Sequence, residues 1–259
     1  YQDSLDAASA TTGMYNGHEW VDLGLSVLWA TCNVGASSPS EYGDYYAWGE
    51  TVTKSNYTTD NSKTYNKNVS DISGNPEYDI ATAKWGENWR MPMKEELEEL
   101  ANKCKWQWTE LDGRNGYKVT GPNGNNIFLP STGYKEFSSC SNKGEVLCWS
   151  ATPADTKNND MFAYALFFNR NNDGMIYFTR NCGVCVRPVI DKEKTTSKTK
   201  VIAQQSVDSA CLEDTCDVNY DENHHGRYNG HEWVDLGLSV KWAACNLGAV
   251  APTGYGGHY

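Results

Sequence analysis

The sequence predicts an α+β fold, with small mixed antiparallel sheets, one or two flanking helices and long loops. Three observations predict it. Residues 21–29 alternate between apolar and polar positions, residues 93–104 carry an apolar stripe at helical spacing, and the short apolar runs that follow are separated by turns containing glycine. Polar stretches rich in Asn, Ser and Thr, such as 51–78, are expected to be surface loops.

The composition predicts a core built from aromatic side chains. The 259 residues include 10 Trp and 16 Tyr, whereas hydrophobic residues make up only 39%. Trp and Tyr bury large areas and carry a polar group that suits half-buried positions. The formal net charge of −11 argues against a nucleic-acid partner, because phosphate binding needs clustered Lys and Arg. No apolar stretch is long enough to predict a membrane span.

An internal repeat sets the domain organisation. Residues 15–46 read YNGHEWVDLGLSVLWATCNVGASSPSEYGDYY, and residues 228–259 read YNGHEWVDLGLSVKWAACNLGAVAPTGYGGHY. About 23 of the 32 aligned positions are identical without a gap, which chance does not produce. We therefore predict a linker or tail at 1–13, a complete domain at 14–190, a polar linker at 191–227 and the truncated start of a second copy at 228–259.

The alternation in residues 21–29 predicts one half-buried strand. The second copy keeps the odd-numbered side chains but replaces Leu28 by Lys241. We therefore expect the odd-numbered side chains to face the core and the even-numbered ones, including Leu28, to face water. Because residues 234–242 carry nearly the same side chains, they can compete for the same place in the domain, within one chain or by exchange between molecules.

Two helices and a series of short strands are expected next. Asp79 can cap a short helix that runs through Lys84. A longer helix is expected from about Met93 to Cys104, because Pro92 precedes it and glutamates occupy its first turn. The strands are predicted at 106–109, 117–120, 126–129, 146–150, 163–169 and 175–179, with a closing segment at 183–189.

Five segments carry a family resemblance. They are 19–27 (EWVDLGLSV), 42–51 (YGDYYAWGET), 89–92 (WRMP), 148–152 (CWSAT) and 186–189 (VRPV). In content and order these segments resemble the Fibrobacter succinogenes major paralogous domain, a family found in exported and surface proteins of gut bacteria. The resemblance covers nearly all of residues 15–189.

The resemblance implies a C-type-lectin-like fold, because that family is similar to this fold and to its formylglycine-generating enzyme branch. The N- and C-terminal strands, near 20–29 and 184–189, are then expected to pair, and long loops to form a ligand face. One position departs from the family, which usually has Thr in place of Met93. A Thr there would form a capping box with Glu96, and its loss should cost the helix end about 1 kcal/mol.

The sequence gives little support for a catalytic site or a metal site. The formylglycine-generating relatives use a cysteine pair in the region of Cys182 and Cys185, but the family's usual residues here are not cysteines. Side chains three apart in a strand also point to opposite faces. The segment 169–174 loosely echoes a calcium loop, yet its twelfth position is Arg180 rather than Glu. We predict no catalytic residues, no metal site and no cofactor, with calcium as the open alternative.

The segment 153–182 is instead the candidate recognition surface. Asn, Tyr and Arg side chains make adaptable contacts with ligands, and this segment is rich in them. The resemblance adds that related domains include targets of diversity-generating retroelements, whose adenine mutagenesis leaves Asn-rich positions in this same C-terminal region. An ordinary polar loop is the alternative. The candidate ligand-binding residues are Asn158, Asn159, Asp160, Asn169, Arg170, Asn171, Asn172, Asp173, Tyr177, Arg180 and Asn181.

The function predicted from the sequence is a non-enzymatic ligand-binding module with a protein or carbohydrate partner. The resemblance places it outside the cell or on the cell surface, although residues 1–13 lack the order of a signal peptide. One alternative is a structural or spacer repeat of a beaded surface protein. Another is an enzyme of the formylglycine-generating type.

Overall fold

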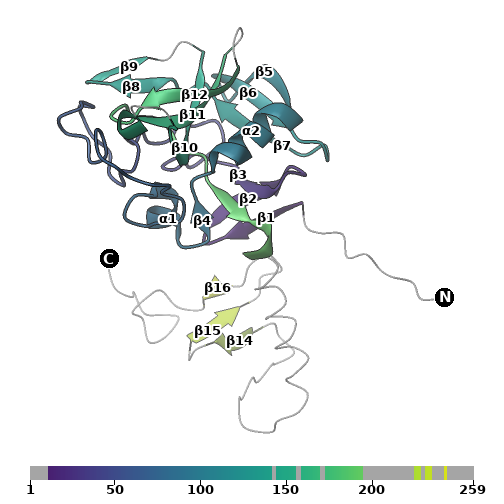
Figure 1. The fold of residues 1–259 in the computed structure, drawn as a ribbon. Coiled ribbons are helices and arrows are strands. Elements are labelled where there is room, and N and C mark those ends of the chain that lie inside the picture. The colour runs from purple at the N-terminus through teal and green to yellow at the C-terminus, as the bar shows by residue number, and fades with distance from the viewer. Residues whose placement is uncertain are drawn as a thin grey trace. The chain divides into compact units, whose positions relative to one another are not determined.

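The computed structural model describes most of the first part of the chain and three strands near its end. The described residues are 11–141, 144–155, 159–169, 173–194, 225–228, 231–234 and 242–243. The chain divides into two compact units, Tyr1–Ile202 and Ala203–Tyr259. The first unit is α+β, with small, mostly antiparallel sheets and few helices (Figure 1), as the sequence predicts.

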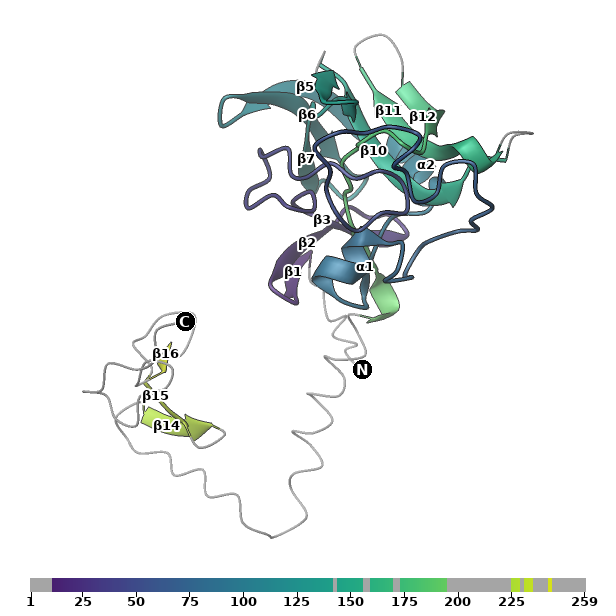
Figure 2. The same cartoon turned by 90° about the vertical axis from the view of Figure 1, so that its left-hand side faces the viewer.

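The largest sheet joins the two ends of the first unit. It contains β1 (Thr12–Tyr15), β2 (His18–Asp22), β3 (Val27–Ala30), β13 (Val189–Asp191) and β4 (Trp89–Arg90), in that order and antiparallel. Val189 of β13 lies opposite Trp29 of β3, and Ile190 lies opposite Leu28. The predicted pairing of the N- and C-terminal strands is therefore confirmed. Figure 2 shows β1, β2 and β3 on one side of the unit.

Residues 21–29 form a hairpin, so the prediction of one continuous strand is wrong. Val21 lies opposite Trp29, and Asp22 opposite Leu28. The chain reverses through Gly24, whose φ is +76° and whose N–H donates to Asp22 Oδ1 at 2.8 Å. Positive φ is accessible to glycine at no steric cost.

Leu28 is only 3% exposed, so the prediction that it faces water is also wrong. It belongs to a core cluster with Trp48 and Trp149, whereas Val21 and Trp29 belong to a second cluster. The sheet is thus covered on both faces, and alternation could not report this. The expectation for the odd-numbered positions is confirmed, because all of them from 21 to 29 are buried.

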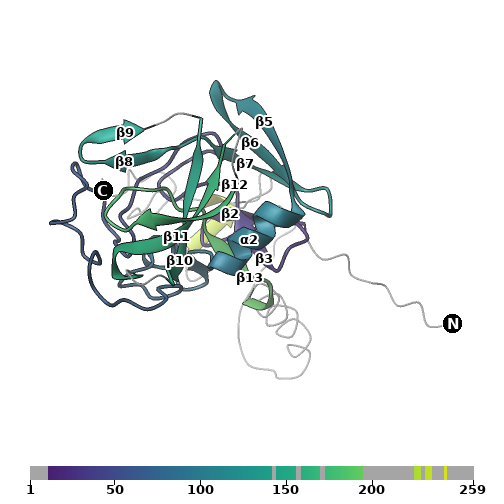
Figure 3. The ribbon, with the colours of Figure 1, turned by 45° about the horizontal axis from the view of Figure 1, so that its top comes forward.

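Two helices lie where the sequence predicts them. α1 (Ile80–Trp85) is capped by Asp79, whose Oδ1 accepts the N–H groups of Ala81 and Thr82 at 2.9 and 3.2 Å. α2 (Lys94–Lys103) buries Leu97 and Leu100. It lies against β10–β12, as Figure 3 shows.

Three further sheets complete the first unit. Their strands are β5 (Lys105–Leu111), β6 (Arg114–Thr120), β7 (Asn126–Pro130), β8 (Tyr134–Glu136), β9 (Ser139–Ser141), β10 (Val146–Pro153), β11 (Phe162–Phe168) and β12 (Asp173–Thr179), with the 3-10 turn η1 (Asn159–Met161) before β11. The sheets have the orders β5-β6-β7, β8-β9 and β10-β11-β12. The β8-β9 hairpin was not predicted.

The core is aromatic, as the composition predicts. The indole N–H of Trp48 donates to the carbonyl of Ser150, and that of Trp149 donates to the carbonyl of Tyr46, at 2.9 and 2.8 Å. Both side chains are fully buried. These bonds remove the penalty that an unpaired buried donor carries.

One buried arginine forms hydrogen bonds with several segments of the core. Arg187 is fully buried, and burial lowers its pKa. Its guanidinium donates to Asn33 Oδ1 and to the carbonyls of Ala30, Thr31 and Phe128, at 2.8, 3.1, 2.6 and 3.0 Å. The segment before β13 is therefore bonded to the end of β3 and to β7.

The second unit repeats the pairing of the first three strands. β14 (His225–Tyr228), β15 (His231–Val234) and β16 (Trp242–Ala243) form an antiparallel sheet in that order. Val234 lies opposite Trp242, as Val21 lies opposite Trp29. β14 begins inside the predicted linker, and β1 begins inside the predicted tail. The reason is that strand pairing uses backbone groups and continues beyond the identical residues.

Candidate functional site

The predicted recognition segment contains β11 and β12, which place two tyrosines side by side. Tyr164 of β11 lies directly opposite Tyr177 of β12, so both side chains are on the same face of the sheet. Their ring centroids are 5.1 Å apart, with the planes tilted by 48°. Tyr164 is 6% exposed and Tyr177 is 50% exposed. Tyr177 therefore offers a ring at the surface that Tyr164 supports from behind.

Both tyrosine hydroxyls bind one carboxylate. Tyr164 Oη and Tyr177 Oη donate to Asp155 Oδ1 at 2.5 and 3.1 Å. Both hydrogen bonds lower the pKa of Asp155, and the bond from Tyr164 has the larger effect. Burial and the bond to Asp155 raise the pKa of Tyr164. The exposed Asp155 is therefore an ionised carboxylate at neutral pH.

A lysine of α2 completes the group. Lys94 Nζ lies 4.3 Å from the centroid of the Tyr164 ring, a cation–π contact. The same ammonium forms an ion pair with Glu98 at 3.6 Å. We refer to Asp155, Tyr164, Tyr177 and Lys94 as the tyrosine–aspartate cluster. One of its two rings already holds a cation.

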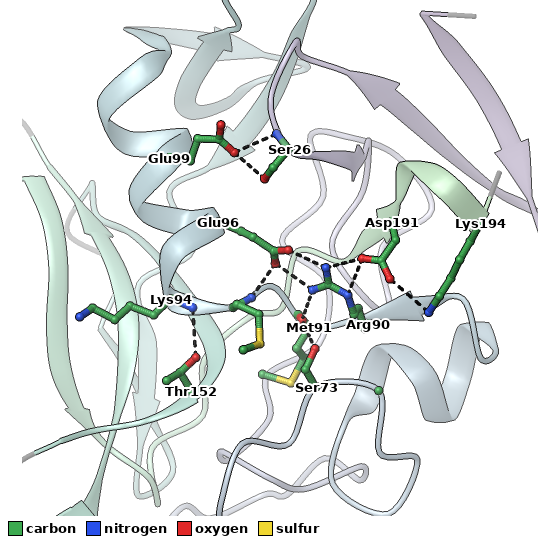
Figure 4. A network of polar contacts seen from close by, with 12 residues as sticks. Ser26, Ser73, Arg90, Met91, Lys94, Glu96, Glu99, Thr152, Asp191 and Lys194 are labelled. Carbon is green, nitrogen blue, oxygen red and sulfur yellow. Dashed lines mark hydrogen bonds and ion pairs between the residues drawn. The ribbon is translucent and has the colours of Figure 1, made fainter. Parts of the chain in front are cut away.

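An ion-pair network fixes the end of α2 that carries Lys94 (Figure 4). Arg90 of β4 donates to both carboxylate oxygens of Glu96, at 2.8 and 2.5 Å, and to Asp191 Oδ1. Such a bidentate pair fixes geometry as well as adding energy. Because Asp191 belongs to β13, the network links α2 to the largest sheet.

The cap of α2 is divided between two residues. Glu96 Oε2 accepts the N–H of Met93 at 2.7 Å, which is the backward half of a capping box. Met93 returns no side-chain cap bond, as expected. The hydroxyl of Thr152 instead accepts the N–H of Lys94 at 3.1 Å (Figure 4). The first residue of α2 is thus held against β10.

The predicted site residues fall into three groups. Those outside the described residues are Asn158, Arg170, Asn171 and Asn172. Those placed on or beside described elements are Asn159 and Asp160 in η1, Asn169 just after β11, and Asp173 and Tyr177 in β12. Tyr177 is the one of these that the structure brings into the tyrosine–aspartate cluster.

The third group, Arg180 and Asn181, is buried, so their prediction as surface contacts is wrong. Arg180 is 1% exposed, and its guanidinium donates to the carbonyls of Phe162 and Lys67 at 2.9 and 3.0 Å. It also lies over the ring of Trp48, and burial lowers its pKa to about 10. Asn181 is 5% exposed. The chain turns inward after β12, where Arg180 donates to the loop carbonyl of Lys67 and to the carbonyl of Phe162 at the start of β11.

The sequence alone does not identify three members of the cluster, which are Asp155, Tyr164 and Lys94. Tyr164 sits in the apolar run of β11, where a tyrosine is indistinguishable from a core residue. Only the register of the β11–β12 hairpin reveals that it faces Tyr177. Asp155 and Lys94 have no local signal, because their contacts with Tyr164 depend on the tertiary fold.

The two cysteines in the region of the formylglycine-generating pair are buried. Cys182 and Cys185 are 1% and 0% exposed. Burial raises the pKa of Cys182 to about 12 and that of Cys185 well above its ordinary value. A thiol reacts and binds metals as the thiolate, which burial disfavours here. Among the described residues, no cluster of three or more His, Cys, Asp or Glu side chains is placed to hold a metal ion.

Within the described part of the chain, no helix is long and apolar enough to cross a membrane. Comparisons with known proteins gave no match: no family model, curated protein or solved structure is significantly similar to this chain.

Proposed function

We propose that the first unit is a non-enzymatic binding module, exported or displayed on a cell surface, that binds a protein or glycan through the tyrosine–aspartate cluster. One observation carries the proposal: a half-exposed tyrosine ring stands beside an exposed, ionised carboxylate. Tyrosine supplies rigid amphipathic contact area at low entropic cost. Such residues dominate binding energy at interfaces.

The fold proposal is the C-type-lectin-like fold of the Fibrobacter succinogenes major paralogous domain. Two features support it: the pairing of β3 with β13 closes the unit, and long segments without regular structure connect β3 to α1. Diversification by a retroelement belongs to the same proposal. An adjacent reverse-transcriptase gene and adenine-rich codons at 158–159 and 169–172 would support it.

The test uses the full chain on arrays of glycans and of cell-surface proteins. The Tyr177→Ala substitution should lower the affinity for the captured ligand by about tenfold or more, which is a loss of about 1.4 kcal/mol or more of binding free energy. Phe137→Ala is the matched control, because Phe137 is 60% exposed, lies in the turn between β8 and β9, and is not a member of the cluster. Equal loss in both variants, or none in either, would refute the assignment of the face.

The second unit supports the alternative that the domain is a structural spacer. The register of β14–β16 reproduces that of β1–β3, as expected of a repeated structural bead. Under this alternative the arrays capture nothing at micromolar concentration, and removing Tyr177 has no consequence for binding.

A further inference from the structure

The outer edge of β12 is open. Among the described strands, β12 is the last of its sheet and pairs with β11 alone. The N–H of Arg180 donates to the carbonyl of Met161 at 3.0 Å, which continues this ladder by one pair. Because bonded and non-bonded pairs alternate in an antiparallel ladder, the backbone groups of Ile176 and Phe178 point to β11.

The backbone groups of Met175 and Tyr177 consequently point away from β11. Among the described residues, no protein group pairs with their N–H or C=O groups. Unpaired edges of this kind are templates for another strand. Exposed edges that bind an extended peptide recognise it through main-chain hydrogen bonds, and side-chain pockets give specificity.

The tyrosine–aspartate cluster reaches this edge through Tyr177, its member in β12. A residue added opposite Tyr177 would have its Cβ atom about 5 Å from that of Tyr177, on the same face of the sheet. A lysine or arginine there can extend over the exposed Tyr177 ring toward the carboxylate of Asp155. Lys94 already makes such a contact with Tyr164, at 4.3 Å from the ring centroid, so these rings suit a cation.

Charge favours the same kind of partner. The chain carries a formal net charge of −11, and Asp155 presents its carboxylate at the surface. Complementary charge speeds encounter and excludes acidic competitors. A basic extended segment therefore fits both the backbone and the side chains of this edge.

We infer that the ligand of this face is an extended segment of a partner protein, bearing a lysine or arginine, that adds to the sheet as a strand beside β12. The inference rests on the proposed function, since it uses the same cluster, and it narrows the ligand from protein or glycan to a basic polypeptide strand.

The test uses the full chain and a defined probe, a peptide of about eight residues that alternates Lys and Thr. Its controls are the Glu/Thr counterpart and the same Lys/Thr peptide N-methylated at alternate residues. The Lys/Thr peptide should bind at least about tenfold more tightly than either control. Asp155→Asn should reduce its affinity by about tenfold, and Phe137→Ala should leave it unchanged.

Amide hydrogen exchange gives a second, independent readout. Peptide binding should slow exchange at Met175 and Tyr177 by about tenfold or more, and change Ile176 and Phe178 little, because these already bond to β11. Equal binding of the N-methylated peptide, or unchanged exchange at Met175 and Tyr177, would overturn the inference. Protection of those amides that grows with protein concentration alone would also overturn it, by assigning the edge to a second copy of the chain.

The outcome separates this inference from the proposed function. If the arrays capture a ligand that depends on Tyr177 but leaves the exchange of Met175 and Tyr177 unchanged, the face binds ligands and strand addition is wrong. If neither the arrays nor the peptide give binding, both proposals fail.

Discussion

The N–H of Lys94 donates to the hydroxyl of Thr152 across 3.1 Å, so α2 takes part of its cap from β10. The residue at the cap position, Met93, has no side-chain acceptor to offer. A residue distant in sequence thus does the work that a local Ser or Thr does in most helices. The same bond also holds Lys94 near Tyr164.

Removing this acceptor should loosen the helix end. Thr152→Val keeps the shape of the side chain and should lower the free energy of unfolding by about 0.5–2 kcal/mol. Thr152→Ser, which keeps the hydroxyl, is the control and should lose much less. Urea unfolding followed by circular dichroism measures both. An unchanged stability of Thr152→Val would show that the hydroxyl does not cap α2.

Leu28 provides a second test, because the repeat holds a lysine at the equivalent position. Leu28→Lys places an ammonium group in a site that is 3% exposed, and it should destabilise the first unit by roughly 3 kcal/mol or more. Leu28→Met, which nearly conserves volume, should cost less than about 1.5 kcal/mol. Thermal unfolding distinguishes the two. A harmless Leu28→Lys would restore the prediction that this position faces water.

Arg187 should be among the most sensitive positions of the core. Arg187→Met leaves three carbonyls and one amide oxygen without their donor, and each unsatisfied buried acceptor costs about 1–3 kcal/mol. We expect a total loss of roughly 3 kcal/mol or more, after partial relaxation. Lys105→Met, on the exposed side of β5, should change stability by less than about 0.5 kcal/mol. Denaturant unfolding of both variants tests the difference.

Acid should weaken the link between α2 and the largest sheet. Burial acts to raise the pKa of Asp191, but its bonds with Arg90 and Lys194 outweigh burial and lower the pKa. The ionised carboxylate therefore contributes stability above the unfolded pKa of about 3.9. That contribution is lost as the pH falls through the lower folded pKa.

Asp191→Asn should flatten this acid dependence. The variant cannot lose a proton, so its stability should change less than that of the natural protein between about pH 5 and pH 2. Unfolding midpoints measured across this range provide the check. Parallel curves for the two proteins would show that other carboxylates dominate acid unfolding.

Binding of a basic peptide should not depend on pH near neutrality. The hydrogen bonds from Tyr164 and Tyr177 lower the pKa of Asp155, so its charge is complete well above about pH 4. The affinity of the Lys/Thr peptide should then be constant from about pH 5 to pH 8 and fall in stronger acid. Fluorescence titrations at several pH values test this. A drop centred near about pH 6.5 would indicate a histidine in place of Asp155.

Local signals in the sequence predicted the elements better than their arrangement. Turn residues such as Gly113 separated the strands correctly, and Asp79 marked the start of α1. The hairpin at Gly24 was missed because its arms keep the alternation of one straight strand. For the site, Tyr177 was identified by its type, whereas Asp155 and Arg180 depend on contacts that form only when distant segments meet.

The position of β13 between β3 and β4 has an evolutionary consequence. The first and last strands of the unit belong to one sheet, so a gene duplication that copies the whole unit yields a self-sufficient bead. Substitutions in one bead then leave the interior of its neighbours untouched. A substitution at the outer edge of β12 in one copy need not alter the same edge in another copy.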